Sequence, residues 1–333
     1  MSEEFLKVFF NKDTVKGHSL ALFDNSVEDD FLLRKYARVY SALAHVNEFT
    51  ETILDIGCGP AIIPIYMSES MNHGKLIFLD ISPEMIKTAK KNAEEKIGND
   101  EIGCEYILSN GEDLGKICPP ESIDAIISRH VIHLMDSPEK FFASAYSGLK
   151  KGGKMVFSFV GHTVHDLLSD STSYITSENG SVQLSMFHNH FYRSLLKSTY
   201  DELPRILESL DLYSKKYLVQ KKIISYRDSR PVLCRNALTP KLSKSKMDLI
   251  FKEAGIPLKN VSYYILPETH TVEFKRRFSQ NWGSIPIPGV WDILPLMAPA
   301  DRYAAVNRIY DVAFPDKNTP VRLSDAVYVV TKQ

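Results

Sequence analysis

The sequence predicts an α/β protein with a mostly parallel sheet that helices cover on both faces. Short, wholly apolar segments alternate with amphipathic ones from Thr52 onward, and strands that are apolar throughout are typical of parallel sheets buried on both sides. The same alternation returns after residue 239. A chain of 333 residues with 44% apolar and 24% charged residues has the makeup of a globular protein with a large core.

Residues 1–50 are predicted to form an N-terminal helical segment. Five apolar side chains recur there at helical spacing: Leu33, Tyr36, Ala37, Tyr40 and Leu43. We expect this segment to precede the core rather than to belong to its sheet.

Residues 51–160 are predicted to form the core, with five strands in the order ETILDIG, KLIFLD, CEYILSN, IDAIISRH and KMVFSFV. Ser82 is expected to cap the helix after the second strand, with Pro83 in its first turn. The segment PEKFFASAYSGLKKGG is expected to be a helix that ends at its glycines.

The rest of the chain is predicted to alternate between insertions and core. Residues 161–239 and 275–324 are insertions that the sheet does not need, whereas residues 240–274 and 325–333 continue the core and supply its last strand. Long insertions at strand ends of α/β proteins usually shape substrate sites. We therefore expect a helical cap, and a homodimer surface or plain decoration is the alternative.

Charge and composition exclude several classes of protein. The 40 basic and 41 acidic residues give a formal charge of −1, which argues against a nucleic-acid coat protein or a polybasic membrane binder. No apolar run approaches the roughly 18 residues of a membrane span, and MSEEFLKVFF is no signal sequence. The four cysteines show no zinc spacing. These features predict a cytoplasmic protein without a membrane or nucleic-acid partner.

The most informative motif is LDIGCGP, residues 54–60, at the end of the first strand. Glycines there allow a sharp turn and a close approach of backbone to ligand. Dinucleotide folds need a third glycine, for which this chain has Ile62, so a diphosphate ligand is disfavoured. Asp80 ends the second strand, where a carboxylate can accept hydrogen bonds from two ribose hydroxyls.

The five strand segments, in this order, resemble the class I S-adenosylmethionine-dependent methyltransferases. ILDIGCGP resembles the first motif of that family, LDISPEM the second and SNGEDL the third, and SIDAIISRHVIHLMDSPE and GLKKGGKMVFSF resemble the fourth and fifth. The resemblance implies a Rossmann-like three-layer sandwich whose seven-stranded sheet has an antiparallel last strand. It also implies S-adenosylmethionine as cofactor and S-adenosylhomocysteine as product.

The resemblance assigns roles to residues at four strand ends. It places Asp80 on the ribose and Ile81 on adenine, with the Gly111 amide facing the ring. Asn110 replaces the usual aspartate, and its side-chain oxygen can still accept from the adenine amino group. Asp55 and the backbone of Gly57 and Ser128 would surround the methionine end. The implied cofactor-binding residues are Asp55, Gly57, Gly59, Asp80, Ile81, Asn110, Gly111 and Ser128.

Methyl transfer from a sulfonium is an in-line displacement, so the protein mainly aligns the two reactants and excludes water. A base helps only a hydroxyl acceptor. His130 is the candidate base, with a packing role as the alternative. Arg129 could bind an acidic substrate group or pair with an acid of the N-terminal segment, and a structural role is favoured for His133. Metal-dependent O-methyltransferases carry an acid here, so we expect no metal.

The insertions supply the candidate substrate residues, which are His162, His165, Tyr192, Trp282 and Trp291. For the aromatic residues, packing within the insertions is the alternative. SRHV is not the Asn/Asp-Pro-Pro-aromatic loop of enzymes that methylate nucleobase or glutamine nitrogen. The sequence therefore predicts a methyltransferase of a small molecule, with oxygen favoured and carbon or nitrogen as alternatives. A non-catalytic S-adenosylmethionine-binding regulatory protein is the competing class.

Overall fold

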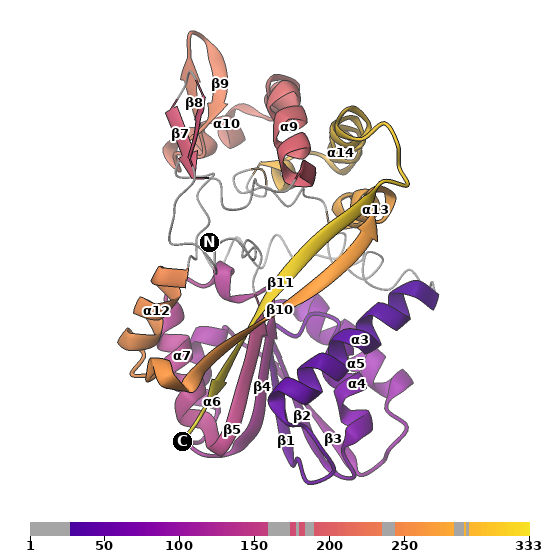
Figure 1. Ribbon diagram of the computed structural model, residues 1–333, viewed down its shortest axis with the longest axis vertical. Coiled ribbons are helices and arrows are strands. Elements are labelled where there is room, and N and C mark those ends of the chain that lie inside the picture. Colours follow the sequence, from indigo (N-terminus) through magenta and orange to yellow (C-terminus); the bar gives the residue numbers. More distant parts are fainter. Residues whose placement is uncertain are drawn as a thin grey trace. The chain divides into compact units, whose positions relative to one another are not determined.

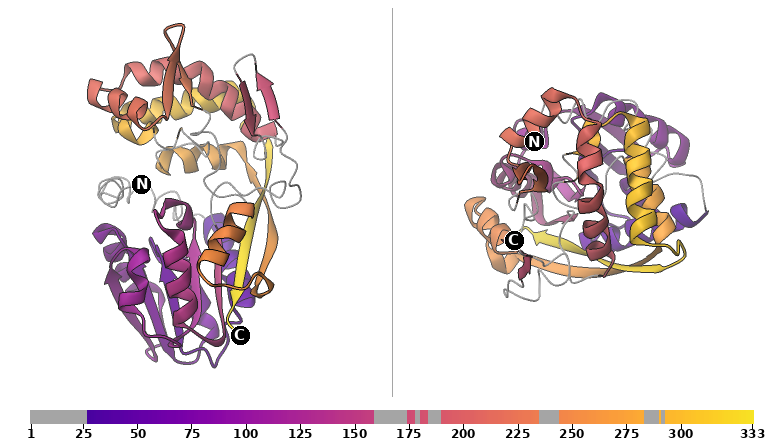
Figure 2. Two further views of the ribbon diagram at one scale, coloured as in Figure 1. Left: turned by 90° about the vertical axis from the view of Figure 1, so that its left-hand side faces the viewer. Right: turned by 90° about the horizontal axis from the view of Figure 1, so that it is seen from above.

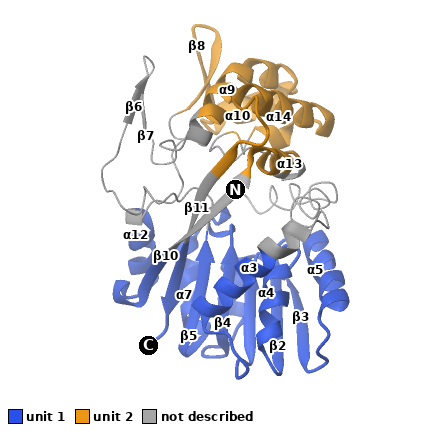
Figure 3. Ribbon diagram, turned by 45° about the vertical axis from the view of Figure 1, so that its right-hand side comes forward, with its two compact units in different colours: residues 1–160, 244–266, 326–333 blue, residues 161–243, 267–325 orange. Residues whose placement is uncertain are grey.

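A computed structural model describes residues 27–158, 174–177, 180–183, 190–234, 244–282, 290 and 293–333. The chain divides into two compact units (Figure 3). The first unit contains residues 1–160, 244–266 and 326–333, and the second contains residues 161–243 and 267–325. Both segments that the sequence marks as insertions fall within the second unit.

The first unit is built on a seven-stranded sheet with the strand order β10-β11-β5-β4-β1-β2-β3 (Figure 1). The strands are β1 Thr52–Ile56, β2 Gly74–Asp80, β3 Ile102–Leu108, β4 Ile123–Arg129, β5 Leu149–Ser158, β10 Val261–Thr271 and β11 Pro320–Thr331. Strands β1 to β5 pair in parallel, and β11 runs antiparallel to β5, with Val327 opposite Ser158. The predicted sheet with an antiparallel last strand is confirmed.

Two groups of helices flank this sheet (Figure 1). One group is α3 Val27–Ala44, α4 Ile62–Met67 and α5 Pro83–Lys96, and the other is α6 Leu114–Ile117, α7 Pro138–Gly148 and α12 Lys244–Glu253. The first group shares an apolar cluster with inward residues such as Phe78 and Val156. On the opposite face Phe142, Phe157 and Phe251 pack together in tilted and edge-to-face contacts. Two apolar layers around one sheet give the three-layer architecture.

Local signals explain where several elements begin. The Ser82 hydroxyl accepts a hydrogen bond from the Met85 amide at 3.3 Å, and Pro83 occupies the first turn of α5, so the predicted cap is confirmed. The helix α7 was expected to continue into the KKGG segment, and this is wrong. It ends at Gly148 because the buried Leu149 already pairs with Ile123 as the first residue of β5.

The last two strands also differ from their expected bounds. The strand-like segment after residue 260 stops at Thr271, because the buried Val272 begins helix α13, Val272–Trp282. The final strand β11 begins at Pro320 rather than at residue 325. Gly255, with φ +73°, follows α12 as the sequence indicates.

Helices and two small hairpins make up the second unit. They are β6 Tyr174–Ser177, β7 Gly180–Gln183, α9 His190–Glu208, α10 Leu212–Gln220, β8 Ile224–Arg227, β9 Arg230–Leu233, α13 and α14 Pro299–Ala313. Helices α9 and α14 lie side by side (Figure 2, right), and Leu203, Ile206 and Ile309 are buried in their shared core. The unit therefore has a hydrophobic core of its own.

Short 3-10 turns complete the described elements: η1 Ser68–Ser70, η2 Gly111–Asp113, η3 Ile132–Leu134, η5 Leu258–Asn260 and η6 Leu294–Leu296. None of the helices in the described ranges combines the length and the apolar character needed to cross a bilayer.

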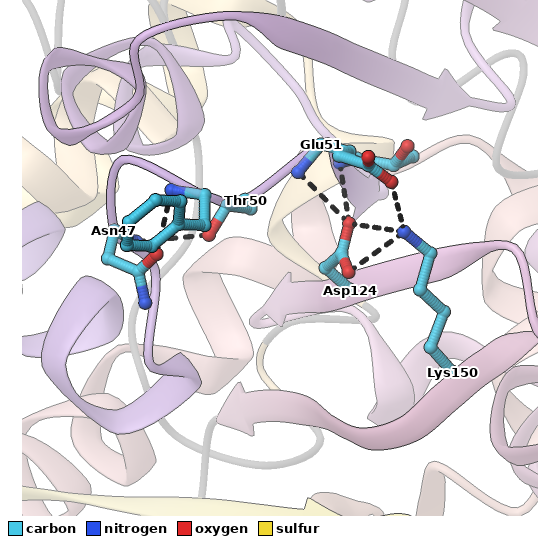
Figure 4. Close-up of polar contacts among 7 residues, drawn as sticks. Asn47, Thr50, Glu51, Asp124 and Lys150 are labelled. Carbon is cyan, nitrogen blue, oxygen red and sulfur yellow. Dashed lines mark hydrogen bonds and ion pairs between the residues drawn. The ribbon is translucent and has the colours of Figure 1, made fainter.

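A polar cluster ties together the strands at the amino-terminal edge of the sheet (Figure 4). The Asp124 carboxylate accepts hydrogen bonds from the amides of Glu51 and Thr52 at 3.1 and 2.9 Å. The Lys150 ammonium lies 2.6 Å from the Glu51 carboxylate and 3.0 Å from that of Asp124. The cluster fixes the starts of β1, β4 and β5, at the edge opposite to the one where these parallel strands end.

Candidate functional site

The glycine motif forms a tight turn between β1 and α4. Gly57 and Gly59 have φ angles of +63° and +50°, which side chains disfavour. A Cβ atom on Gly57 would lie only 2.3 Å from Cγ2 of Val131, in the segment after β4. Ile62, at the place of the third glycine of dinucleotide folds, is buried in the first turn of α4. The turn thus keeps the first two glycines and has a packed isoleucine in place of the third.

The Asp80 carboxylate bridges two loops at this edge. Its Oδ2 accepts a hydrogen bond from the Gly59 amide and its Oδ1 from the Ser82 amide, each at 2.9 Å. The residue is 7% exposed. Burial raises its pKa to about 6, although backbone hydrogen bonds with Ser82, Gly59 and Ile81 act in the other direction. The loops after β1 and β2 therefore converge on one carboxylate that titrates near neutrality.

Asp55 adds a second buried acid to the same edge. It lies in β1, paired with Phe78 of β2 and Ile127 of β4. Burial, and then the charge of Asp80, raise its pKa well above the ordinary range. Two nearby buried carboxyl groups disfavour carrying charge together. Burial likewise raises the pKa of the Cys58 thiol, which makes it a poor nucleophile.

The remaining predicted cofactor residues lie at the ends of β2, β3 and β4. The Asn110 Oδ1 accepts a hydrogen bond from the Glu112 amide at 3.1 Å, and Gly111 lies close to Ile56 and Met135. The buried Ser128 hydroxyl donates to the Ile56 carbonyl at 3.1 Å, which ties the end of β4 to the end of β1. Ile81 is half-buried. Parallel strands bring these residues to one edge.

Helix α3 holds the segment that follows β4. The Arg129 guanidinium lies over the Tyr36 ring, 4.4 Å from its centre. His130 has a φ angle of +59°, and its amide donates to the Ser158 carbonyl at 2.8 Å. The Tyr40 hydroxyl donates to Ser158 Oγ at 3.0 Å. The end of β4, the end of β5 and α3 are thus joined.

The sequence placed Tyr36 and Tyr40 only in the apolar stripe of a helix and assigned no role to Ser158. The signal that could have indicated these contacts is the pair of tyrosines, four residues apart, on the buried face of α3. Buried tyrosines usually find a polar partner for the hydroxyl or a cation for the ring.

Several predicted residues lie outside the described part of the structure. These are His162, His165 and Trp291. Tyr192 and Trp282 lie in α9 and α13 and His133 lies in η3, but their side chains are not among those described. Their roles stay predictions. Within the described ranges, no three or more His, Cys, Asp or Glu side chains gather so that they could hold a metal ion.

Comparison with known proteins agrees with the fold just described. Residues 54–157 match the methyltransferase domain family. Over 150 residues the chain is 31% identical to malonyl-[acyl-carrier protein] O-methyltransferase 1 of Ilyobacter polytropus, covering 43% of this chain and 53% of that protein. It is 22% identical to malonyl-[acyl-carrier protein] O-methyltransferase of Halalkalibacterium halodurans, covering 88% of this chain and 100% of that protein.

A solved structure shows the same fold over the chain. It is phosphoethanolamine N-methyltransferase 2 of Haemonchus contortus in complex with S-adenosyl-L-methionine, with a TM-score of 0.50 and 15% identity. The alignment covers 100% of this chain and 60% of that one. The sheet order, the two-glycine turn and the family match define a class I methyltransferase fold. Residues 54–157 thus resemble a methyltransferase domain in sequence and lie within the part of the sheet that has this fold.

Proposed function

We propose that the chain transfers the methyl group of S-adenosylmethionine to an oxygen atom of a small acyl acceptor in a biosynthetic pathway. The observation that carries this proposal is the buried Asp80 carboxylate, bonded to the two-glycine turn at the carboxyl-terminal edge. The relatives from Ilyobacter and Halalkalibacterium methylate a malonyl group on an acyl carrier protein, as their names state. The nucleophilic oxygen of a malonyl thioester is its carboxylate, so we propose a carboxylate acceptor.

The residues at this edge fit S-adenosylmethionine. Gly57 has no side chain, and Val131 fills the place that a Cβ would take, so the two loops pack closely and Gly57 adds no side chain that could block a ligand. Asp80 offers the ribose hydroxyls a carboxylate in a dry environment. One Asn110 oxygen lone pair binds the Glu112 amide, which leaves the second for the adenine amino group. S-adenosylmethionine supplies a methyl group that its sulfonium already activates.

Further contacts of the cofactor are proposed for the neighbouring residues. Ile81 would pack on the adenine ring, with the Gly111 amide beside it. Asp55 and the backbone of Gly57, Gly59 and Ser128 would enclose the methionine end, because they lie at the carboxyl ends of the adjacent strands β1 and β4 or directly after β1.

Arg129 is proposed to orient the acceptor carboxylate. A guanidinium binds a carboxylate through two parallel hydrogen bonds, and stacking on Tyr36 at 4.4 Å limits the rotation of the Arg129 side chain. A carboxylate is ionised at neutral pH and needs no base. His130 would act as a base only if the acceptor were a hydroxyl. His133 would then have a structural role in the segment after β4.

We also propose that the second unit carries acceptor recognition, with His162, His165, Tyr192, Trp282 and Trp291 as its candidate residues. The chain leaves the core for this unit just after Ser158. The Ser158 carbonyl already binds the His130 amide, so the segment that leads to the second unit starts beside Arg129 and His130, which are proposed to contact the acceptor.

The direct test is methyl transfer from labelled S-adenosylmethionine to malonyl thioesters, phenols and amines in parallel. We expect label in a base-labile methyl ester. Label in an amine or on carbon would overturn the choice of oxygen. Binding of S-adenosylhomocysteine without transfer to any acceptor would favour the non-catalytic regulatory protein.

The variant His130→Ala distinguishes the two kinds of oxygen acceptor. With a carboxylate acceptor we expect kcat to fall by less than about tenfold, since alignment dominates the rate. With a hydroxyl acceptor, loss of a general base would cost about 10²–10⁴-fold. His130→Asn is the matched control, because asparagine tolerates a positive φ better than other side chains. A loss of S-adenosylhomocysteine affinity in either variant would instead place His130 at the cofactor.

A further inference from the structure

The second unit carries a strongly basic segment at α10 and the hairpin that follows it. We call residues 211–230 the α10 surface. It contains six basic residues and two acidic ones, whereas the whole chain has a formal charge of −1. The basic residues are Lys215, Lys216, Lys221, Lys222, Arg227 and Arg230. The excess of positive charge is therefore local to this segment.

Apolar side chains are exposed among these charges. Ser214 and Leu218 anchor α10 in the core of the unit. Leu212, Lys216 and Val219 are four and three residues apart, so they share the opposite helix face. Leu212 is 67% exposed and Val219 is 43% exposed, and the neighbouring Tyr213 is 82% exposed. Tyr226 of β8 adds a fourth apolar side chain at 53% exposure.

Several of these basic side chains have no acidic partner in the parts of the chain that the structure describes. The Asp211 carboxylate caps α10, accepting from the amide and the hydroxyl of Ser214, both at 2.8 Å. The side chains of Lys216, Lys222 and Arg230 form no ion pair or hydrogen bond with the described parts of the chain. The Lys221 ammonium lies 5.9 Å from the centre of the Tyr217 ring. Most of the basic groups therefore face solvent.

We propose that the α10 surface docks an acidic protein, namely the acyl carrier that presents the acceptor. This inference rests on the proposed function. Protein interfaces combine an apolar, often aromatic centre with a charged rim, which is the arrangement of Leu212, Tyr213 and Tyr226 among lysines. A nucleic-acid site would instead need a continuous basic track along a groove. Excess positive charge selects an acidic partner and speeds its association.

The docking is tested first by binding, without turnover. A fluorescent acyl carrier protein with an acidic surface is titrated with the native chain and with Lys216→Glu/Lys222→Glu. We expect binding that weakens as salt rises and at least about tenfold weaker binding by the variant. Lys140→Glu/Lys259→Glu, two exposed lysines of the first unit, changes the net charge equally and should bind as the native chain does. Equal binding by the two variants, or no binding by the native chain, overturns the docking proposal.

The second test compares a carrier-bound substrate with a small one. For the malonyl group on the carrier protein, kcat/KM of Lys216→Glu/Lys222→Glu should fall about tenfold, whereas for malonyl-N-acetylcysteamine it should match the native value. Tyr213→Ala should show the same selective loss. The docking alone is refuted if the native chain methylates the small thioester and the charge-reversed variant methylates the carrier-bound substrate as fast as the native chain does. A native chain that binds the carrier but methylates neither substrate refutes the proposed acceptor and leaves the docking supported.

Discussion

Acidic residues lie at both edges of the central sheet, but their pKa values are shifted in opposite directions. At the amino-terminal edge, Lys150 lies 2.6 Å from the exposed Glu51 and holds the pKa of its carboxyl group below the ordinary value. At the carboxyl-terminal edge, burial raises the pKa of Asp80 and of Asp55. An acid that serves the fold is stabilised in its charged form by a cation of the chain. Buried acids with a raised pKa at the ends of parallel strands are typical of ligand-binding sites.

Positive φ angles occur at both edges, and at the amino-terminal edge Glu121, just before β4, also carries a side chain. Gly152, near the amino-terminal edge, has a φ angle of +80° and open space around it. At the carboxyl-terminal edge the positive φ angles include those of Ala61 and His130, which carry side chains. A left-handed conformation costs such a residue about 1–2 kcal/mol. Strain of this kind is retained where the surrounding structure holds it, often at functional sites.

The largest expected effect is that of Gly57→Val. The new side chain would overlap Val131, since even a Cβ would lie 2.3 Å from its Cγ2, so binding of S-adenosylhomocysteine should be undetectable by calorimetry. Gly152→Val is the matched control, because it places a side chain at a positive φ without a steric clash. We expect it to lower the melting temperature and to leave ligand affinity unchanged. Native-like affinity in a folded Gly57→Val protein would rule out the turn as the cofactor site.

Asp80→Ala should have the next largest effect. Two ribose hydroxyls lose a charged acceptor in a dry site, which should weaken S-adenosylhomocysteine binding by about 2–3 kcal/mol. Asp124→Ala tests the other edge. It removes an acceptor of the Glu51 and Thr52 amides, so it should lower stability by about 1–3 kcal/mol without changing affinity. Calorimetry and chemical denaturation measure the two quantities, and equal losses of affinity in both variants would contradict the contrast between the edges.

The pH dependence of S-adenosylhomocysteine binding should show an effect of intermediate size. Burial raises the pKa of Asp80 from 3.8 to about 6 and so favours its neutral form. The neutral form adds to the free energy of unfolding at low pH, and this contribution is lost as the pH rises from about 4 through 6. Ribose hydroxyls donate to the ionised form, so affinity for S-adenosylhomocysteine should change in the opposite direction and rise through about pH 6. Titration calorimetry across that range measures this, with Asp80→Asn as the variant that should flatten the profile. An unchanged slope in Asp80→Asn would assign the titration to another group.

The smallest expected effect is that of Glu51→Gln. The Glu51 side chain is largely exposed, and solvent screens its pair with Lys150. Ligand affinity and the melting temperature should both stay within experimental error of the native values. A clear loss of stability would show that the amino-terminal edge depends on this ion pair rather than on the bonds of Asp124.

Strand and helix patterns were readable from the sequence because they depend on neighbours along the chain. Apolar segments with β-branched residues gave the five core strands, and Ser82 with Pro83 gave the start of α5. Gly57, Gly59 and Asp80 could be placed at one edge because parallel strands bring their carboxyl ends together. The prediction that α7 ends at the glycines of KKGG was wrong, because Leu149 pairs with Ile123 in the sheet and this pairing outweighed the tendency of glycines to end a helix.

The sequence by itself determined the fold class, and it predicted which residues lie at the edge of the sheet that holds the candidate site. Only the tertiary structure decided that Val131 fills the space that a Cβ on Gly57 would need, that Tyr36 stacks on Arg129 and that Tyr40 binds Ser158, a residue 118 positions away. It also decided which acids resist ionisation, because burial is a property of the whole packed core. Contacts between distant segments and the dielectric around a carboxyl group arise from packing, so local sequence patterns do not encode them.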